Sequence, residues 1–157
     1  MANFSPPPQW RETHAGHWLA LGLRRFDARV LHLMARNVRV GLALSNLAAR
    51  GRLTASHVHI TRHLDPKGMR LGVLADKAGV SKQAMGKLVD QCAAWGLVER
   101  ARDPDDARAC LVRFSAAGLA WLDAYAMAVE QAEQELQQAV GPEVATVIKL
   151  GLEAYAS

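Results

Sequence analysis

The stretch over residues 71–95 constrains the fold more than any other part of the chain. Residues 72–77 form a short helical pattern, and a break at Ala78-Gly79-Val80 separates it from a second helical pattern over 82–95. Ser81 stands directly before the second helix, where its hydroxyl can accept a backbone N–H as an N-cap. The second helix has its apolar residues on one side: Met85, Leu88, Val89 and Cys92. Two helices joined by a short, glycine-containing turn predict a helix-turn-helix.

A second local pattern follows this one directly. Residues 97–100 and 110–114 alternate between apolar and polar side chains, as strands with one buried face do. Between them lies Asp103-Pro104-Asp105-Asp106, whose residue types favour a turn. The two stretches therefore predict a β-hairpin immediately after the helix-turn-helix.

A long helix is predicted before these elements. From about His17 to Arg50 the chain has no proline, and Gly51 suits the residue after a helix end. Apolar residues recur every three to five positions in this stretch: Leu19, Leu23, Phe26, Val30, Leu33 and Val38. The other face carries Arg24, Arg25, Arg29, Arg36 and Arg39. Thr54 is the expected N-cap of a short helix that follows, over 54–63.

The end of the chain predicts two further helices. Ser115 precedes a helical stretch that runs to about Val140, and Pro142, after Gly141, suits the first position of a last helix. One stripe of this last helix consists of Val144, Val147, Ile148, Gly151 and Tyr155. The small core leaves that stripe uncovered. We therefore expect a homodimer whose interface is built from both chain ends, with Gly151 allowing close helix approach.

Composition narrows the class of protein. The 157 residues are 50% hydrophobic and 6% aromatic, which favours one mainly helical domain over a β-sandwich. No stretch reaches the ~18 apolar residues of a membrane span. Residues 1–10 lack the pattern of a signal peptide, so we expect a cytoplasmic protein with no membrane partner. Cys92 and Cys110 are too few for a disulfide framework, and both are interpreted as small core residues.

The charge is divided unevenly along the chain. Residues 1–113 hold 18 Lys and Arg against 9 Asp and Glu, whereas residues 114–157 hold 1 against 6. This division favours a polyanionic partner for the first two thirds of the chain. The alternative is that the basic side chains merely solvate helix faces.

Taken in this order, the elements resemble the MarR family of winged helix-turn-helix transcription regulators over roughly 53–122. Residues 71–75 and 79–83 resemble the first two motif elements, and residues 96–100 resemble the strand that enters the wing. Residues 103–109 resemble the family's wing signature, which continues at Val112, Phe114, Ser115 and Gly118.

The resemblance implies a mainly α fold with a small β-hairpin wing, in which a winged helix-turn-helix is flanked by long dimerisation helices. It implies a flexible arm over 1–16, a dimerisation region over 17–52 and 115–157, and a DNA-binding domain over 53–114. The implied function is a dimeric repressor that binds a pseudo-palindromic operator in double-stranded DNA and is modulated by a small ligand. The alternative is a winged-helix module that binds a protein or coats DNA without sequence specificity.

The residues of the second helix fit a recognition helix. Lys82, Gln83, Ala84, Gly86 and Lys87 lie opposite the apolar stripe, next to Ser81. Glutamine can pair bidentately with adenine, and lysine can reach guanine acceptors or phosphates. The resemblance further implies that Arg108 enters the minor groove and that Asp106 orients it. The alternative for Asp106 and Arg108 is an exposed surface pair.

The sequence departs from the family pattern at several positions. Ala84 and Gly86 stand where the family commonly has hydroxyl residues, and Thr61 stands where leucine is common in the second helix. Gly86 also weakens its helix by about 0.5–1 kcal/mol relative to alanine. We therefore expect shape and phosphate contacts to carry much of the affinity for DNA.

The resemblance also implies a small aromatic anion as effector. The candidate lining combines apolar bodies with cationic or hydrogen-bonding tips: Trp18, Arg24, Arg25, His57 and Thr61. The alternative is that the arginines only solvate the first helix and that Trp18 packs in the core.

Metal and enzyme interpretations find little support in the sequence. His59 and His63 have the i, i+4 spacing of a zinc pair, with His57 nearby, but no cysteine or acidic residue in that helix completes a ligand set. We find no phosphate-binding loop, nucleophile elbow or paired catalytic carboxylates. We therefore expect no cofactor and no enzymatic activity.

Overall fold

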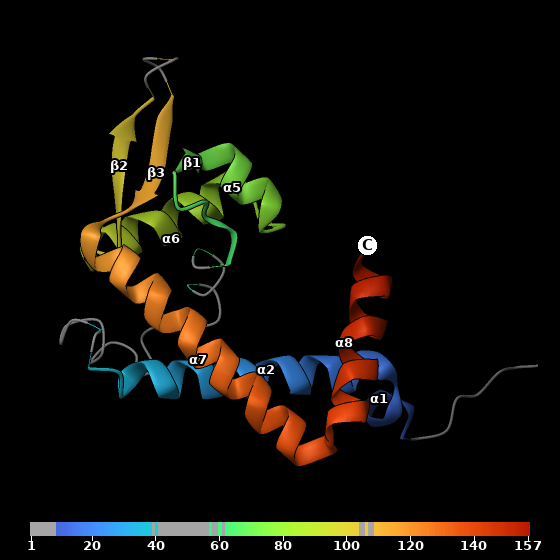
Figure 1. Ribbon diagram of the computed structural model, residues 1–157. Coiled ribbons are helices and arrows are strands. Elements are labelled where there is room, and N and C mark those ends of the chain that lie inside the picture. The colour runs from blue at the N-terminus through green and yellow to red at the C-terminus, as the bar shows by residue number, and fades with distance from the viewer. Residues whose placement is uncertain are drawn as a thin grey trace, which may run out of the picture.

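The computed structural model describes residues 9–38, 40, 57, 60, 62–103, 106 and 109–157. Its elements are α1 (Trp10–Thr13), α2 (Ala15–Ala35), β1 (Met69–Arg70), α5 (Leu71–Lys77), α6 (Lys82–Ala94), β2 (Val98–Arg102), β3 (Cys110–Phe114), α7 (Ala116–Val140) and α8 (Pro142–Ala156). Figure 1 shows a winged unit, built from β1, α5, α6, β2 and β3, and a helical part in which α2, α7 and α8 meet. This arrangement confirms the expected fold class. Within the described ranges, no helix has both the length and the apolar character needed to cross a membrane.

The helix-turn-helix forms as its local signals predict. Gly79 has φ +65° in the turn between α5 and α6, a left-handed conformation that glycine adopts without strain. Ser81 is the N-cap of α6, because its Oγ accepts the N–H of Ala84 at 3.1 Å. The inner side of α6 is buried through Met85, Val89 and Cys92. Packing thus holds α6 from one side and leaves its other side in solvent.

The wing is a three-stranded antiparallel sheet in the order β1-β3-β2. Strands β2 and β3 form the predicted hairpin, with Val98 opposite Phe114 and Arg102 opposite Cys110. Strand β1 pairs with the other edge of β3, where Met69 lies opposite Val112. The added strand joins the wing to the start of α5, so the hairpin is attached to the helix-turn-helix at both of its edges.

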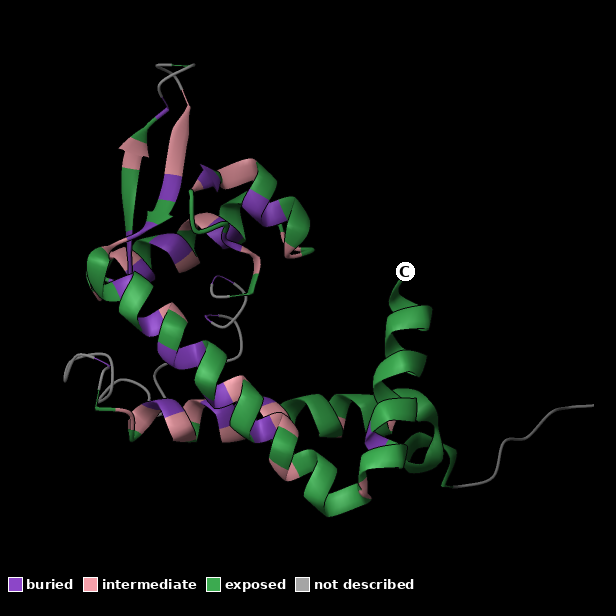
Figure 2. Ribbon diagram, viewed as in Figure 1, coloured by how far each residue is buried: buried purple, intermediate pink, exposed green. Residues whose placement is uncertain are grey.

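Helix α7 connects the winged unit to the helical part. It begins at Ser115, whose Oγ accepts the N–H of Gly118 at 2.9 Å, and ends before Gly141, after which Pro142 opens α8 as predicted. The first turns of α7 are buried against the winged unit, and its later turns pack along α2. Figure 2 shows buried residues in the winged unit and where α2 and α7 meet, whereas α8 is almost entirely exposed.

The predicted bounds of the first helix were wrong at its C-terminal end. Helix α2 ends at Ala35 rather than near Arg50, because the N–H groups of Arg36 and Asn37 turn back to carbonyls three residues earlier and tighten the chain out of the helix. Val38, which the periodicity assigns to the apolar face, is 97% exposed, and Val40 is buried instead. The expected features at Gly51 and Thr54 lie outside the described residues.

At the N-terminal end, helical structure begins earlier than expected. Helix α1 lies within the arm predicted over 1–16, and α2 begins at Ala15. The side chain of His14 caps α2 by accepting the N–H of His17 at 3.2 Å. A histidine N-cap is an uncommon start signal, which is why the sequence pattern did not indicate it.

Candidate nucleic-acid interface

The exposed face of α6 carries the residues predicted to contact DNA. Lys82, Gln83, Ala84 and Lys87 are all exposed, whereas Met85 and Val89 on the inner side are fully buried. Ser81 is exposed too, but its hydroxyl is engaged as the cap. The structure therefore places these five predicted residues together, on the first two turns of one solvent-facing helix beside the wing (Figure 1).

An acidic residue lies on the same exposed face of α6 and forms an ion pair with the wing. Asp90 lies further along α6, and its carboxylate accepts a hydrogen bond from Nη2 of Arg100 on β2 at 2.7 Å. The hydrogen bond to Asp90, followed by one to Cys110, raises the pKa of Arg100 above its ordinary value. The ion pair keeps the negative charge of Asp90 partnered within the protein, and it joins α6 to strand β2. The sequence interpretation did not identify this pair, since Arg100 stands in a strand pattern ten residues away.

A buried carboxylate holds the end of β2 that leads into the wing loop. Asp103 is 6% exposed, and its Oδ2 accepts Nε of Arg70 at 2.5 Å. The backbone N–H of Asp103 also donates to the carbonyl of Ala109 at 3.3 Å. Asp103 was predicted only as part of a turn, and no local signal connects it to Arg70, which lies 33 residues earlier. The contact anchors the end of β2 to β1.

In the loop at the tip of the wing, the structure describes Asp106 and Ala109. Asp106 is exposed, and its carbonyl accepts the N–H of Ala109 at 2.9 Å. Arg108 lies outside the described residues, so the proposed contact between Asp106 and Arg108 stays a prediction. Lower on the wing, Arg113 and Glu99 form a cross-strand ion pair at 2.6 Å.

Of the residues predicted to line an effector cavity, the four that the structure describes do not line one common pocket: Trp18, Arg24, Arg25 and His57. Trp18 is 60% exposed and lines an apolar groove of about 780 Å³ between α2, α7 and α8. His57 is buried in the winged unit, with Nε2 at 2.9 Å from Oε1 of Gln91 and its ring 4.6 Å from that of Trp95. Arg24 and Arg25 are exposed on α2 and are not part of the groove lining. Thr61 lies outside the described residues.

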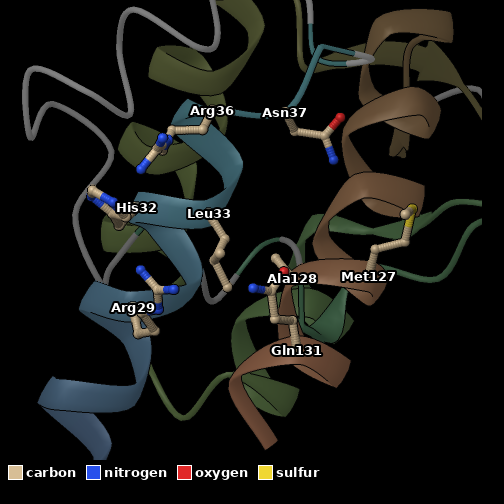
Figure 3. Close-up of a pocket in the computed structure, with 8 residues that line it drawn as sticks. All are labelled: Arg29, His32, Leu33, Arg36, Asn37, Met127, Ala128 and Gln131. Atoms are coloured by element: carbon tan, nitrogen blue, oxygen red, sulfur yellow. The ribbon is translucent and has the colours of Figure 1, made fainter. Parts of the chain in front are cut away.

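A different cavity gathers cationic side chains between α2 and α7. It has a volume of about 400 Å³ and is lined by Arg29, His32, Leu33, Arg36, Asn37, Met127, Ala128 and Gln131. Figure 3 shows Arg29 and His32 on α2 and Arg36 at its C-terminal cap, with Met127, Ala128 and Gln131 on α7. The sequence interpretation placed Arg29 and Arg36 on a solvated helix face. The spacing of Arg29, His32 and Arg36, at i, i+3 and i+7, is the signal that could have grouped them.

Arg29 is already paired at the edge of this cavity. Its Nε and Nη2 donate to the two carboxylate oxygens of Glu135 at 2.7 and 2.6 Å. This hydrogen bonding raises the pKa of Arg29 and lowers the pKa of Glu135. Because Glu135 neutralises Arg29, an anion in the cavity would depend most on Arg36 for its charge partner, with the ring of His32 able to supply a hydrogen bond.

The cysteines and histidines form no further site among the described residues. Burial raises the pKa of Cys92 to about 12, so its thiol stays protonated and unreactive at neutral pH. Cys110 is half-buried on β3. No group of three or more histidine, cysteine or acidic side chains in the described ranges is arranged to hold a metal ion, and His59 lies outside those ranges.

Comparison with known proteins identifies the winged segment. Residues 53–109 match the model of the MarR family. None of the curated protein sequences that were compared matches the chain. Solved structures with a similar fold include the transcriptional repressor CouR bound to a 23-mer DNA duplex, at 20% identity and a TM-score of 0.71, covering 98% of this chain and 100% of CouR.

Two further solved structures share the fold over most of their length. Wild-type MarR from E. coli, in its apo form, is 20% identical with a TM-score of 0.64, covering 90% of this chain and 96% of MarR. Bordetella bronchiseptica BpsR, whose DNA binding is regulated by 6-hydroxynicotinic acid, is 19% identical with a TM-score of 0.65, covering 97% of this chain and 99% of BpsR. The winged segment thus matches the MarR family of transcriptional regulators, and the fold over most of the chain is the one seen in these solved structures.

Proposed function

We propose that the protein is a homodimeric repressor that binds a pseudo-palindromic operator and is modulated by a small anionic effector. The observation that carries this proposal is the exposed face of α6, where Lys82, Gln83 and Lys87 stand opposite a buried face. A recognition helix requires this division, because its free side must reach base edges and phosphates in the major groove. A DNA-bound repressor with the same fold supports the proposal.

Each residue of the interface has a chemical role in this proposal. Gln83 pairs with adenine, whereas Lys82 and Lys87 bind guanine acceptors or phosphates. The methyl group of Ala84 suits contact with a thymine methyl. Arg108, oriented by Asp106, enters the minor groove. Two-fold symmetry of a dimer requires half-sites about one helical turn apart.

The proposed division of the chain follows from these roles. Residues 53–114 form the DNA-binding unit, and residues 17–52 and 115–157 form the dimerisation region. The apolar residues that α8 leaves exposed support the second assignment, since an uncovered apolar face of this extent is typical of an interface: Val144, Val147, Ile148, Leu150, Leu152 and Tyr155.

Lys87→Ala is expected to weaken binding to DNA without altering the fold. A duplex that the wild-type protein selects from random sequences is the probe, and fluorescence anisotropy over a salt series is the measurement. Loss of one phosphate contact lowers the salt slope of log affinity by about 1. Arg25→Ala is the matched control, because it removes the same positive charge from an exposed site on α2 rather than on the winged unit, and we expect it to bind like the parent.

The same titrations separate the proposal from its alternatives. Equal affinity for the selected duplex and for an unrelated duplex, with a steep salt dependence, would indicate DNA coating without specificity. No binding to either duplex at low salt would indicate a protein partner instead. An unchanged salt slope for Lys87→Ala would remove Lys87 from the interface.

For the effector, we propose a small aromatic carboxylate in the cavity between α2 and α7. This cavity combines His32 and Arg36 with the apolar side chains of Leu33 and Met127, and about 400 Å³ accommodates such a molecule. The regulation of BpsR by 6-hydroxynicotinic acid supports this class of ligand. We propose this cavity in place of the lining expected from sequence, because Trp18 lines a groove beside α8 whereas His57 contacts Gln91 of α6.

Salicylate is a direct probe of this cavity. We expect calorimetric titration to show binding that Arg36→Ala abolishes and that Arg24→Ala, a charge change on the same helix outside the cavity, leaves intact. We also expect operator DNA to weaken salicylate binding, because a ligand regulates only through different affinities for the two states. Unchanged salicylate affinity in the presence of DNA would refute regulation by this compound. Loss of binding in Arg24→Ala alone would return the site to the sequence-predicted lining.

A further inference from the structure

A buried carboxylate lies where the winged unit meets the helical part. Asp27 is 6% exposed, and with Val30 and Met34 it makes up the buried stripe of α2. Its Oδ1 accepts Nη2 of Arg62. Arg62 belongs to a helical stretch that leads towards β1. The ion pair therefore links the helical part to the chain segment that enters the winged unit.

Tyr125 on α7 belongs to the same polar cluster. It is 8% exposed, and its burial raises the pKa of the phenol, while the charge of Arg62 and a hydrogen bond from it act in the opposite direction. Asp27, Arg62 and Tyr125 thus bring together α2, the entry to the winged unit and α7. Their surroundings are apolar, because Val30, Met34, Ile60, Trp121 and Ala124 are all buried in the same core.

Stability alone does not explain a charged pair at this position. Asp27 is buried, whereas the Arg62 side chain keeps 29% of its surface exposed. Replacing a buried charge and its partner by apolar residues of similar volume is often neutral or stabilising. An ion pair that is also a hydrogen bond depends on direction, because it weakens when the donor and acceptor atoms are poorly aligned. Apolar side chains can slide past one another at much smaller cost.

We infer that Asp27 and Arg62, supported by Tyr125, are positioning residues that set the orientation of the winged unit on α2. In the dimer this orientation fixes the separation of the two recognition helices and hence the operator spacing that fits. The effect on operator spacing rests on the proposed dimeric, DNA-binding function. The orientation of the winged unit on α2 does not, because it is a property of each single chain.

The first test measures orientation without DNA. Spin labels on Lys82→Cys in α6 and Arg25→Cys in α2, both exposed sites, report their distance distribution in a Cys110→Ser background. Excess unlabelled protein suppresses signals between chains. We expect a narrow distribution in the parent and a broad or shifted one in Asp27→Leu/Arg62→Met. The matched control is Arg29→Met/Glu135→Leu, which removes an ion pair between α2 and α7 and should keep the narrow distribution.

A second variant covers the case in which the double substitution does not fold. Arg62→Lys keeps the positive charge but loses the planar guanidinium group, whose N–H donors have a fixed geometry. We therefore expect a melting temperature close to the parent's and a broadened distance distribution. A distribution as narrow as the parent's in either folded variant would overturn the inference. Circular dichroism melting identifies which variants are folded.

The second test measures the consequence for DNA. Against selected operators whose half-sites are moved apart by one or two base pairs, the parent should show one preferred spacing. Asp27→Leu/Arg62→Met should lose about 2- to 30-fold in affinity at that spacing and should discriminate less among the others. An unaltered spacing profile would contradict the inference. If the parent binds no duplex, the proposed function fails, while the spin-label distances still decide the orientation.

Discussion

Gly118→Ala, in the first turn of α7, is expected to destabilise the protein more than alanine at any other described glycine. A Cβ at Gly118 would lie 1.9 Å from the carbonyl oxygen of Leu97 and 3.1 Å from Cδ1 of Phe114. The carbonyl cannot turn away freely, since it accepts the N–H of Ser115 at 3.1 Å and the Ser115 hydroxyl at 3.3 Å. Backbone would have to move, so the cost should reach or exceed the upper end of the ~1–3 kcal/mol typical of overpacking.

Thermal and urea unfolding measure this effect. Gly72→Ala is the matched control, because a Cβ at Gly72, in α5, meets no atom within 4 Å. That substitution should leave stability unchanged or raise it by up to about 1 kcal/mol. If Gly118→Ala and Gly72→Ala melted at the same temperature, the close approach of α7 to Leu97 would not be a feature of the folded protein in solution.

If the protein forms the proposed homodimer, Val147→Asp is expected to convert it into a monomer. Val147 is 69% exposed and Tyr155 85% exposed on α8, and an apolar groove lined by Trp18 lies alongside. Burying one such side chain stabilises an interface by about 1.5–3 kcal/mol, and an unpaired carboxylate in the same place opposes association strongly. No atom lies within 4 Å of a Cβ built on Gly151, so this turn of α8 is open to a second helix.

Sedimentation at micromolar concentration tests the dimer directly. Val38→Asp is the control, since Val38 is 97% exposed at the opposite end of α2 from the groove and should tolerate the same charge. A parent protein that sediments as a monomer would refute the homodimer. A Val147→Asp variant that stayed dimeric would move the interface away from α8. Because a pseudo-palindrome requires two winged units, the monomeric variant should also lose most of its operator affinity.

Local signals were enough to predict most of the helices and the hairpin. Ser81 and Ser115 cap their helices within three residues of their own positions, and Gly79 and Gly141 adopt the positive φ angles of their turns. Such interactions involve neighbouring residues, so they are encoded in short stretches of sequence. The buried side of α6 was likewise visible as an apolar stripe, and with it the exposed face that the proposed function uses.

The end of α2 shows where the same reasoning failed. Periodicity continued through Val38, but the helix stops at Ala35, and the chain turns so that Val40 rather than Val38 is buried. Apolar spacing records which residues prefer burial. It does not record where neighbouring elements leave room for a helix to continue.

The sequence by itself therefore determined the kinds of elements, their order, the exposed and buried faces of α6, and the resemblance of the winged segment to the MarR family. Only the tertiary structure decided which distant charges meet: Arg70 with Asp103, Arg62 with Asp27, and Arg29 with Glu135, at separations of 33, 35 and 106 residues. It also decided that Trp18 and His57 stand apart and that Arg29, His32 and Arg36 share a cavity. The physical reason is that caps, turns and amphipathic faces depend on residues a few positions apart. Ion pairs and cavities depend instead on how complete helices pack.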